Sequence, residues 1–321
     1  MNFLGMSTIA MTPGYQALRA HTAWLDLSAR GKIKVSGEDR ARLLHAMSTN
    51  HVQQLTPGAG CYAFFLNAQG RILADVNLFC FEDRFLLDTE PETRRKLFEH
   101  LDRYIIADDV TLSDETDHVT TVALEGPEAA ALLAKLGAPV PETPYSTATW
   151  GSRTVARVDS TGSGGFFIFT APDDQPHLIE DLENAGAIAA TFHDSSVVRI
   201  ENGRPRYGEE ITERFLVQET GQLQAVHFSK GCYLGQEIVE RVRSRAQIHR
   251  LLRRVEIDSS EVPPAGTKLH IPDIAAGDAG EIVSAVLSPS LGKVVAMAYM
   301  RTPNSEPGTE LTINGAPARV T

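Results

Sequence analysis

The chain has 321 residues, of which 42% are hydrophobic and 22% charged, and its formal net charge at pH 7 is −11. This composition is typical of a soluble globular protein of two or three domains, and the negative charge argues against a protein that coats nucleic acid. The three cysteines, Cys61, Cys80 and Cys232, form no Cys-x-x-Cys pair, which argues against a disulfide framework and a protein-only structural zinc site. The sequence shows no secretory leader and no apolar run of 18 residues, so we expect a cytoplasmic protein that holds no metal ion and does not bind a membrane.

The first part of the chain mixes helical and strand patterns. Apolar spacing predicts a helix over 15–30, a strand over 31–37 and a second helix over 38–50. Three strands are expected between 60 and 89, with turns at "NAQG" and "FEDR". A helix and a further strand follow, up to about residue 115.

The middle of the chain repeats this mixture. The predicted elements are a strand at 118–125, a helix over 126–139, strands at 153–158 and 165–169, a helix at 175–185 and a strand near 197–201. Two α+β lobes with antiparallel sheets and flanking helices are therefore expected, roughly residues 1–115 and 116–248, with interleaving left open. From 249 to 321, short strands separated by Pro, Gly and Asp predict a small all-β barrel domain.

The stretch "SKGCYLGQE", residues 229–237, places Cys232 between two glycines at the predicted start of a helix. A helix N-terminus and the neighbouring Lys230 would both favour the thiolate, which is the form that acts as a nucleophile or soft-metal ligand. The alternative is an unreactive packed thiol, since most free cysteines behave as small apolar side chains. Cys61 and Cys80 lie in apolar strand patterns and are predicted to be core residues.

Two carboxylates interrupt apolar segments. Asp75 follows "GRILA" and Glu201 ends "VVRIE", each on a predicted strand. A carboxylate in apolar surroundings is either paired or has a raised pKa, so it tends to bind a specific donor or to carry out chemistry. A planar heterocycle with amino and ring N–H donors would suit such a group. A surface-facing position on a half-buried strand is the alternative.

Residues 241–254, "RVRSRAQIHRLLRR", contain six arginines. Guanidinium groups bind phosphates and carboxylates through a fork of donors, so a polyanionic ligand tail or an RNA backbone would fit there. The solvated edge of a strand between two domains is equally consistent with the pattern. No aromatic RNA-binding motif accompanies the arginines, so support for RNA binding is weak.

Three segments together resemble one family. "KGCYLGQE", residues 230–237, is similar to the signature of the YgfZ-type folate-binding proteins, relatives of the glycine-cleavage T-protein (aminomethyltransferase) that act in iron–sulfur protein maturation. "GCYAFFLNAQGRILADVNLF", residues 60–79, resembles the family's strand–turn–strand before the folate pocket, and "VRIENGRPRYGEEI", residues 198–211, resembles its Arg-x-Glu-x-Gly segment. The order of these segments and the C-terminal β domain agree as well, so the resemblance covers nearly the whole chain.

The resemblance implies that tetrahydrofolate, or another folate derivative, binds in a central cavity between the lobes, with Asp75 and Glu201 facing the pterin. Cys232 would be the functional cysteine at the rim of this cavity, and Asp75 and Lys230 would share its catalytic role. The other binding residues implied in this way are Tyr62, Asn67, Arg199, Tyr233, Gln236 and Glu237.

The function implied by the resemblance is that of a folate-binding accessory protein for the assembly or repair of iron–sulfur proteins, using Cys232. One cysteine cannot hold a four-iron cluster alone, so a client or scaffold protein would have to share it. One alternative is a folate-dependent aminomethyl or other one-carbon transferase that uses Asp75. Another is a folate-regulated tRNA-modification factor that contacts RNA through Arg241, Arg243 and Arg245. The cysteine motif favours the maturation role over a glycine-cleavage enzyme.

Overall fold

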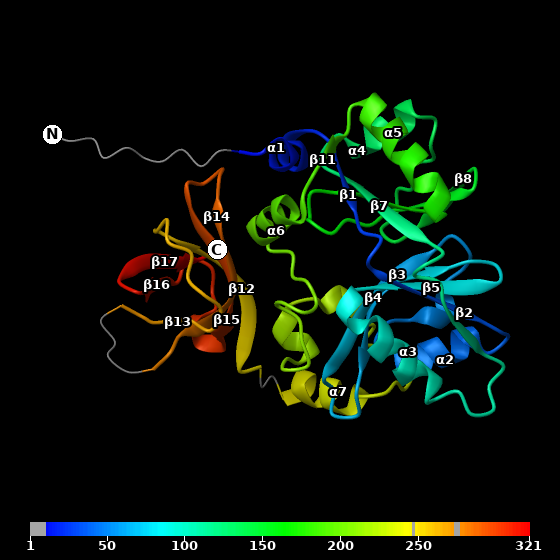
Figure 1. Cartoon of the computed structure of the whole chain (residues 1–321). Helices are drawn as coiled ribbons and strands as arrows, with labels where there is room; N and C mark the ends of the chain where they lie inside the picture. Colours follow the sequence, from blue (N-terminus) through cyan, green and yellow to red (C-terminus); the bar gives the residue numbers. More distant parts are fainter. Residues whose placement is uncertain (1–10, 246–247, 273–276) are drawn as a thin grey trace.

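The computed structural model describes residues 11–245, 248–272 and 277–321 (Figure 1). Its first sheet is antiparallel and has the strand order β3-β4-β5-β2-β6. The strands are β2 (Gly31–Ser36), β3 (Gly60–Leu66), β4 (Ile72–Cys80), β5 (Arg84–Thr89) and β6 (Thr111–Asp114). The helices α2 (Arg40–Met47) and α3 (Arg94–Asp102) pack their apolar residues against one face of this sheet. The three strands predicted between 60 and 89 and the helix predicted over 38–50 are confirmed.

The second sheet takes its strands from two distant parts of the chain. It has the order β11-β1-β7-β10-β9-β8, and only the two-residue edge strand β11 runs parallel to its neighbour. The strands are β1 (Ala23–Asp26), β7 (Thr120–Glu125), β8 (Thr147–Trp150), β9 (Arg153–Ala156), β10 (Gly165–Thr170) and β11 (Ile188–Ala189). The helices α4 (Ala129–Lys135) and α5 (Gln175–Ala185) cover its outer face. The lobes are therefore interleaved, because β1 precedes the whole first sheet in sequence.

The helix predicted over 15–30 is wrong beyond its first turns. The helix α1 (Pro13–Ala20) ends early, and residues 23–26 pair with β7 as the strand β1. The apolar residues of this segment fit the spacing of a helix and also the alternation of a strand. Long-range strand pairing decides between the two.

The strand predicted near 197–201 is also wrong. These residues belong to the helix α6 (Phe192–Glu201), which begins with a capping box. The Thr191 hydroxyl accepts from the Asp194 amide at 3.1 Å, and the Asp194 carboxylate accepts from the Thr191 amide at 2.8 Å. This cap starts a helix in which the β-branched residues are tolerated because they are buried in the core.

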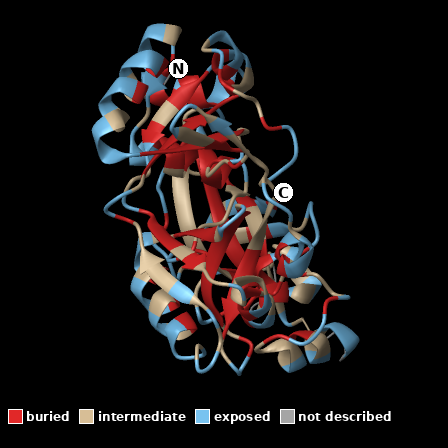
Figure 2. Ribbon diagram, turned by 90° about the vertical axis from the view of Figure 1, so that its right-hand side faces the viewer, coloured by how far each residue is buried: buried red, intermediate tan, exposed pale blue. Residues whose placement is uncertain are grey.

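The two sheets meet face to face through aromatic side chains. Phe79 and Leu86 of the first sheet pack against Phe167 and Phe169 of the second, and the Phe79 and Phe169 ring centroids lie 5.5 Å apart. The buried strands run through the middle of the molecule, and exposed helix faces surround them (Figure 2). Residues between the sheets can therefore form a site shielded from solvent.

The C-terminal part of the chain is a six-stranded antiparallel sheet of order β13-β14-β15-β12-β17-β16. The isolated bridge between His270 and Thr312 nearly closes it into a barrel. The strands are β12 (Arg250–Ile257), β13 (Lys268–Leu269), β14 (Gly280–Ser288), β15 (Lys293–Arg301), β16 (Glu310–Ile313) and β17 (Ala316–Val320). The predicted α+β class with two sheets and a C-terminal barrel is confirmed. Within the described ranges, no helix has the length and apolar character that a membrane crossing requires.

A buried carboxylate connects the barrel to the lobes. The side chain of Glu201, at the end of α6, is 3% exposed and accepts from the Tyr15 hydroxyl at 2.9 Å and the Ser288 hydroxyl at 2.5 Å. Tyr15 belongs to α1 and Ser288 ends β14, so one side chain joins three elements.

Replacing Glu201 by alanine should lower the free energy of unfolding by about 1–3 kcal/mol, because two buried hydroxyls lose their acceptor. Urea denaturation followed by circular dichroism measures this change. The control is Glu237→Ala, which removes a carboxylate that is 82% exposed and paired with Arg241; it should change the free energy by less than about 0.5 kcal/mol. Equal effects of the two substitutions would contradict the proposed role of Glu201.

Candidate functional site

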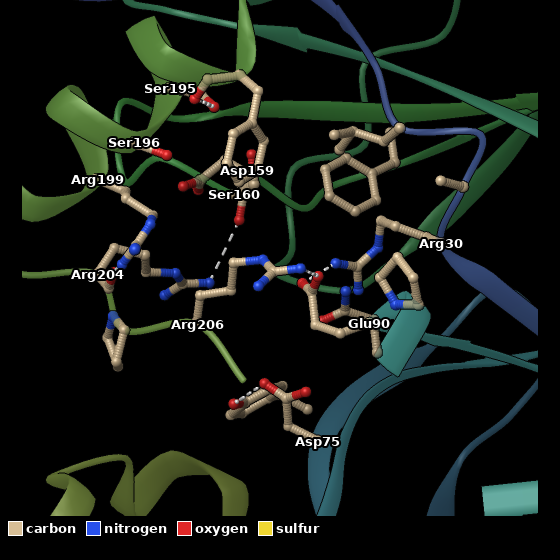
Figure 3. A pocket seen from close by; sticks show the side chains of 18 of the residues that line it. Arg30, Asp75, Glu90, Asp159, Ser160, Ser195, Ser196, Arg199, Arg204 and Arg206 are labelled. Atoms are coloured by element: carbon tan, nitrogen blue, oxygen red, sulfur yellow. Dashed lines mark hydrogen bonds and ion pairs between the residues drawn. The ribbon is translucent and has the colours of Figure 1, made fainter. Parts of the chain in front are cut away.

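A cavity lies where the two sheets face α6 and the segment that follows it (Figure 3). Its volume is about 180 Å³. Its polar and charged lining residues include Arg30, Tyr62, Asp75, Asn77, Glu90, Asp159, Arg199, Arg204 and Arg206. These residues come from six segments that are far apart in sequence, so only the fold brings them together.

Strand alternation points Asp75 into this cavity. Ala74, Val76 and Leu78 of β4 pack on the side of α2 and α3, so Asp75 and Asn77 point to the opposite face. Asp75 is 8% exposed. The Tyr62 hydroxyl donates to its Oδ2 atom at 2.8 Å, whereas Oδ1 is buried and accepts no hydrogen bond from the described residues. The cavity therefore offers a free carboxylate oxygen to a ligand N–H or O–H group.

The surroundings of Asp75 raise the pKa of its carboxyl group toward neutral pH. Burial raises the pKa of Asp75 to about 6, and the charge of Glu90 adds to this rise, whereas Arg30 and the hydrogen bond from Tyr62 oppose it. A carboxyl group with this pKa can take up and release a proton near neutrality, as general acid–base catalysis requires.

Paired charges build the wall beside Asp75. The Arg30 guanidinium donates to Asp88 at 2.8 Å and also pairs with Glu90. The second Glu90 oxygen binds the Arg206 guanidinium at 3.0 Å. The Asn77 amide donates to Asp88 at 2.8 Å. These contacts hold the crossover between β1 and β2, the end of β5 and the segment after α6 in one network.

Two other arginines keep donors available to a ligand. Arg199 pairs with Glu209 and, at 2.8 Å, with Glu210, but its buried Nε atom has no acceptor in the part of the chain that the structure describes. Arg204 forms no ion pair with a described carboxylate, and its Nη2 atom donates to the Asp159 carbonyl at a long 3.4 Å (Figure 3). The cavity thus combines a free acceptor with free donors, which suits a ligand that has both N–H and carbonyl or anionic groups.

Glu201 lies outside this cavity, and the helix is the reason. Residues two apart share one face of a strand, but on an α-helix they are about 200° apart. Arg199 therefore faces the cavity, while Glu201 faces α1 and the barrel. The expectation that Glu201 holds the pterin rested on the strand assignment and on the family resemblance. The helix removes the first basis, and pterin binding by Glu201 stays a prediction from the second.

Other predicted binding residues also lie outside the cavity lining. The side-chain oxygen of Asn67, Oδ1, accepts hydrogen bonds from the backbone amides of Gln69 and Arg71, each at 3.0 Å. Asn67 thereby stabilises a turn. Gln236 accepts from the Tyr233 amide at 3.3 Å, and Glu237 pairs with Arg241 on the helix α7 (Gln236–Arg245). The Tyr233 ring is buried. Of the residues implied by the resemblance, Tyr62, Asp75 and Arg199 line the cavity.

Lys230 is buried and faces the end of α2. Its ammonium donates to the carbonyl of Ser48 at 2.5 Å, to that of Asn50 at 2.9 Å and to that of His45. Burial lowers the pKa of Lys230 to about 7, whereas carbonyl oxygens at a helix C-terminus favour the charged form. The lysine thus fastens its loop to α2, and no contact among the described residues supports the expected activation of Cys232 by Lys230.

The three cysteines differ in accessibility. Cys232 is exposed and lies outside the cavity lining. Cys80 is buried, as predicted, and Cys61 is half-buried against the core of the first sheet, where burial raises the pKa of its thiol to about 12. Across residues 11–245, 248–272 and 277–321, no group of three His, Cys, Asp or Glu side chains has the arrangement of a metal site.

Sequence reasoning missed much of the charged lining. Arg204 and Arg206 lie inside the quoted segment 198–211, and their closeness to Arg199 could have suggested a shared site. Arg30 and Glu90 carry no local signal, because they are separated by 60 residues and meet only through sheet pairing and the crossover.

Comparisons with known proteins agree with this architecture. A family model described as the GCVT N-terminal domain matches residues 8–230, and one described as the glycine cleavage T-protein C-terminal barrel domain matches residues 250–321. The chain is 31% identical over 315 residues to the aminomethyltransferase of Rubrobacter xylanophilus, with 94% of this chain and 82% of the relative covered. It is 28% identical over 311 residues to the aminomethyltransferase of Streptomyces coelicolor, with 92% of this chain and 82% of the relative covered.

A solved structure shares the fold. The crystal structure of glycine cleavage system aminomethyltransferase T from Bartonella henselae superimposes with a TM-score of 0.86 at 23% identity, and covers 96% of this chain and 87% of that one. The chain therefore belongs to the glycine-cleavage T-protein family. These matches identify the wider family, and membership of its YgfZ-type branch stays a prediction.

Asp75→Asn should be more stable than the wild type at pH 7, by up to about 3 kcal/mol, because it removes a buried ionisation. The folded-state pKa of Asp75, about 6, lies above the usual unfolded value, so folded wild type retains a proton that the unfolded chain releases. Its stability therefore falls as the pH rises through about 4 to 6, and the advantage of the variant should vanish below this window. Urea denaturation of both proteins at several pH values measures the difference.

The control is Asp174→Asn, which should change the stability at pH 7 in the opposite direction. Hydrogen bonds from Arg153 and Thr170 lower the pKa of Asp174 to about 2. The ionised carboxylate therefore stabilises the fold at neutral pH, and Asp174→Asn should be less stable than the wild type at pH 7. If Asp75→Asn showed this same pH profile, Asp75 would not be a destabilised buried carboxylate.

Proposed function

We propose that this protein is a folate-dependent one-carbon transferase of the aminomethyltransferase type, with Asp75 as its acid–base group. The observation that carries the proposal is the Oδ1 atom of Asp75, a buried acceptor without a partner among the described residues in a cavity between the two sheets. The aminomethyltransferases at about 30% identity support the same reaction class.

The cavity lining fits a reduced pterin. A pterin is a planar ring with amino and ring N–H donors along one edge and a carbonyl acceptor, and a folate carries carboxylates at its other end. Asp75 Oδ1 would accept from the donors, while Arg199 Nε and Arg204 would donate to carbonyl or carboxylate oxygens. Phe167 adds apolar surface to the same lining.

The protein's own residues would carry out three tasks. Tyr62 orients the Asp75 carboxyl group through its hydrogen bond. Burial keeps water away from Asp75 and brings its pKa to about 6, so that it can hold or release a proton at the ligand nitrogen it faces. The arginine pairs around Glu90 keep the cavity wall in place. Tetrahydrofolate, when bound, supplies the nitrogen atoms that accept the one-carbon unit.

In this mechanism, Asp75→Asn should lower kcat/KM about 10²- to 10⁴-fold in a glycine-cleavage assay with a lipoylated carrier protein. The Kd of tetrahydrofolate, measured by calorimetry, should change much less, since the amide oxygen still accepts a hydrogen bond. Wild-type activity should rise with pH around 6 if Asp75 acts as a base.

Tyr62→Phe is the matched control. The Tyr62 hydrogen bond lowers the pKa of Asp75, so its loss should move the midpoint of the pH profile upward and leave most of the activity. Full activity of Asp75→Asn would rule out Asp75 as the acid–base group and would leave the thiol-based function below as the better explanation.

A second candidate function rests on the exposure of Cys232. Its loop is fastened to α2 by Lys230, so an accessible thiol sits on an ordered support outside the cavity. This arrangement suits the predicted accessory role in iron–sulfur protein maturation, in which Cys232 would meet a client or scaffold protein. The folate site would then regulate the interaction.

No comparable observation supports the predicted contact with tRNA. Arg241 pairs with Glu237 and Arg243 with Glu240, and Arg243 also lies over the Phe228 ring at 4.5 Å. The Arg245 side chain lies outside the described residues. Both described arginines are thus balanced by carboxylates of the same helix.

Iodoacetamide should alkylate Cys232 in the native protein at least about tenfold faster than Cys61 or Cys80, because Cys232 alone of the three is exposed. Mass spectrometry of timed samples measures the rates. If the maturation role holds, Cys232→Ser should fail to restore iron–sulfur enzyme activity in cells that lack the protein, while folate binding is kept. Full restoration by Cys232→Ser would contradict a functional thiol.

A further inference from the structure

A second cavity lies between the barrel and the segment after α6. Its volume is about 190 Å³, which is close to that of the first cavity. Its lining comes from the loop before residue 217 and from the barrel strands β12 to β15. The residues are Arg214, Phe215, Arg250, Lys268, Asp278, Gly280, Glu281, Val283, Tyr299 and Arg301. The two cavities have no lining residue in common, so this one is a separate site.

A stacked pair of buried aromatic rings lines the second cavity. The rings of Phe215 and Tyr299 stack with centroids 3.7 Å apart and an angle of 13° between their planes, and both residues are buried. The Arg250 guanidinium lies 4.8 Å from the Phe215 centroid, and its Nε atom donates to Glu219 at 2.9 Å. Arg250, which belongs to the arginine-rich segment 241–254, is therefore held in one orientation over the aromatic pair.

The lining carries an excess of positive charge. It contains four cations (Arg214, Arg250, Lys268 and Arg301) and two carboxylates (Asp278 and Glu281). With Glu219, which pairs with Arg250, four positive and three negative charges give a sum of +1 in a chain of net charge −11. Lys268 forms an ion pair with Glu281 at 2.7 Å. Arg214 is 67% exposed and reaches Glu281 only at 3.8 Å.

Arg301 is the least satisfied of these cations. Its guanidinium makes no ion pair or hydrogen bond with any residue that the structure describes, although its backbone amide bonds to Ala279. Arg214 and Arg301 therefore line the cavity with guanidinium donors, and Arg301 is the cross-strand partner of Arg250.

We propose that this second cavity binds a small oligoanion, a polyphosphate or an oligocarboxylate, through Arg214, Arg250 and Arg301. Guanidinium forks match phosphate and carboxylate oxygens, and three arginines lining one cavity favour a ligand with several anionic oxygens. The concave shape and small volume select a small molecule, or one charged group of a larger one. The proposal is independent of the chemistry at Asp75, because the two cavities do not share residues.

Calorimetry of the full-length protein at low ionic strength tests this site with two probes, tripolyphosphate and citrate. At least one probe should bind with a stoichiometry of one, and the one that binds identifies phosphate or carboxylate as the preferred group. The double variant Arg214→Gln/Arg301→Gln should weaken this binding at least about tenfold. Asp75→Asn should leave it unchanged, which separates this site from the first cavity.

The matched control removes the same two charges elsewhere. Arg95 is 90% exposed on α3 and Arg319 is 61% exposed on β17, so Arg95→Gln/Arg319→Gln lowers the net charge equally without touching the second cavity. This variant should keep the wild-type affinity. The proposal is overturned if neither probe binds at millimolar concentration, or if the control variant loses as much affinity as Arg214→Gln/Arg301→Gln. Because all four arginines have exposed side chains or lie at the surface of the barrel, circular dichroism should show each variant folded.

Discussion

The carboxylate of Glu90, shared by two guanidinium groups, is the interaction on which the first cavity depends. One oxygen pairs with Arg30 in the crossover between the lobes, and the other binds Arg206 in the segment after α6. Buried charges are costly unless they are paired, so each of the three side chains keeps the other two in place. The same charges act on Asp75: Glu90 raises its pKa and Arg30 lowers it. The network therefore shapes the cavity and also sets the protonation of its central carboxyl group.

The helix α6 connects this site to the barrel. One face of this helix lines the cavity and another contacts α1 and the barrel. Arg199 therefore faces the cavity, whereas Glu201 faces Tyr15 and Ser288. The adjacent segment reinforces the connection, because the Tyr299 hydroxyl of the barrel donates to the Glu210 carbonyl, and the Glu210 carboxylate holds Arg199. The barrel thus supports the wall of the cavity through hydrogen bonds as well as through packing.

The cysteine motif and the cavity are two separate features of the chain. Lys230 anchors the motif to α2 through three carbonyls, while Cys232 is exposed and is not among the residues that line the cavity. The chemistry proposed for the cavity is centred on Asp75, and the names of the similar aminomethyltransferases support the proposed reaction class. A role for Cys232 would add to that chemistry, and it would be carried out at a different surface.

Periodicity in the sequence was sufficient for the fold class, the strands around Asp75 and the barrel, because alternation and turn residues are local properties. Asp75 could be singled out as a carboxylate on an apolar strand, and the strand β4 does direct it inward. The tertiary structure decided the rest. The segment with Arg199 and Glu201 has β-branched residues typical of a strand, and a capping box with core burial makes it a helix. The pairs of Arg30 with Glu90 and of Arg206 with Glu92 join residues 60 and 114 positions apart, and the direction of the Lys230 ammonium depends on carbonyls about 180 positions away. Local patterns extend over a few residues, so contacts of this range become visible only when the chain has folded.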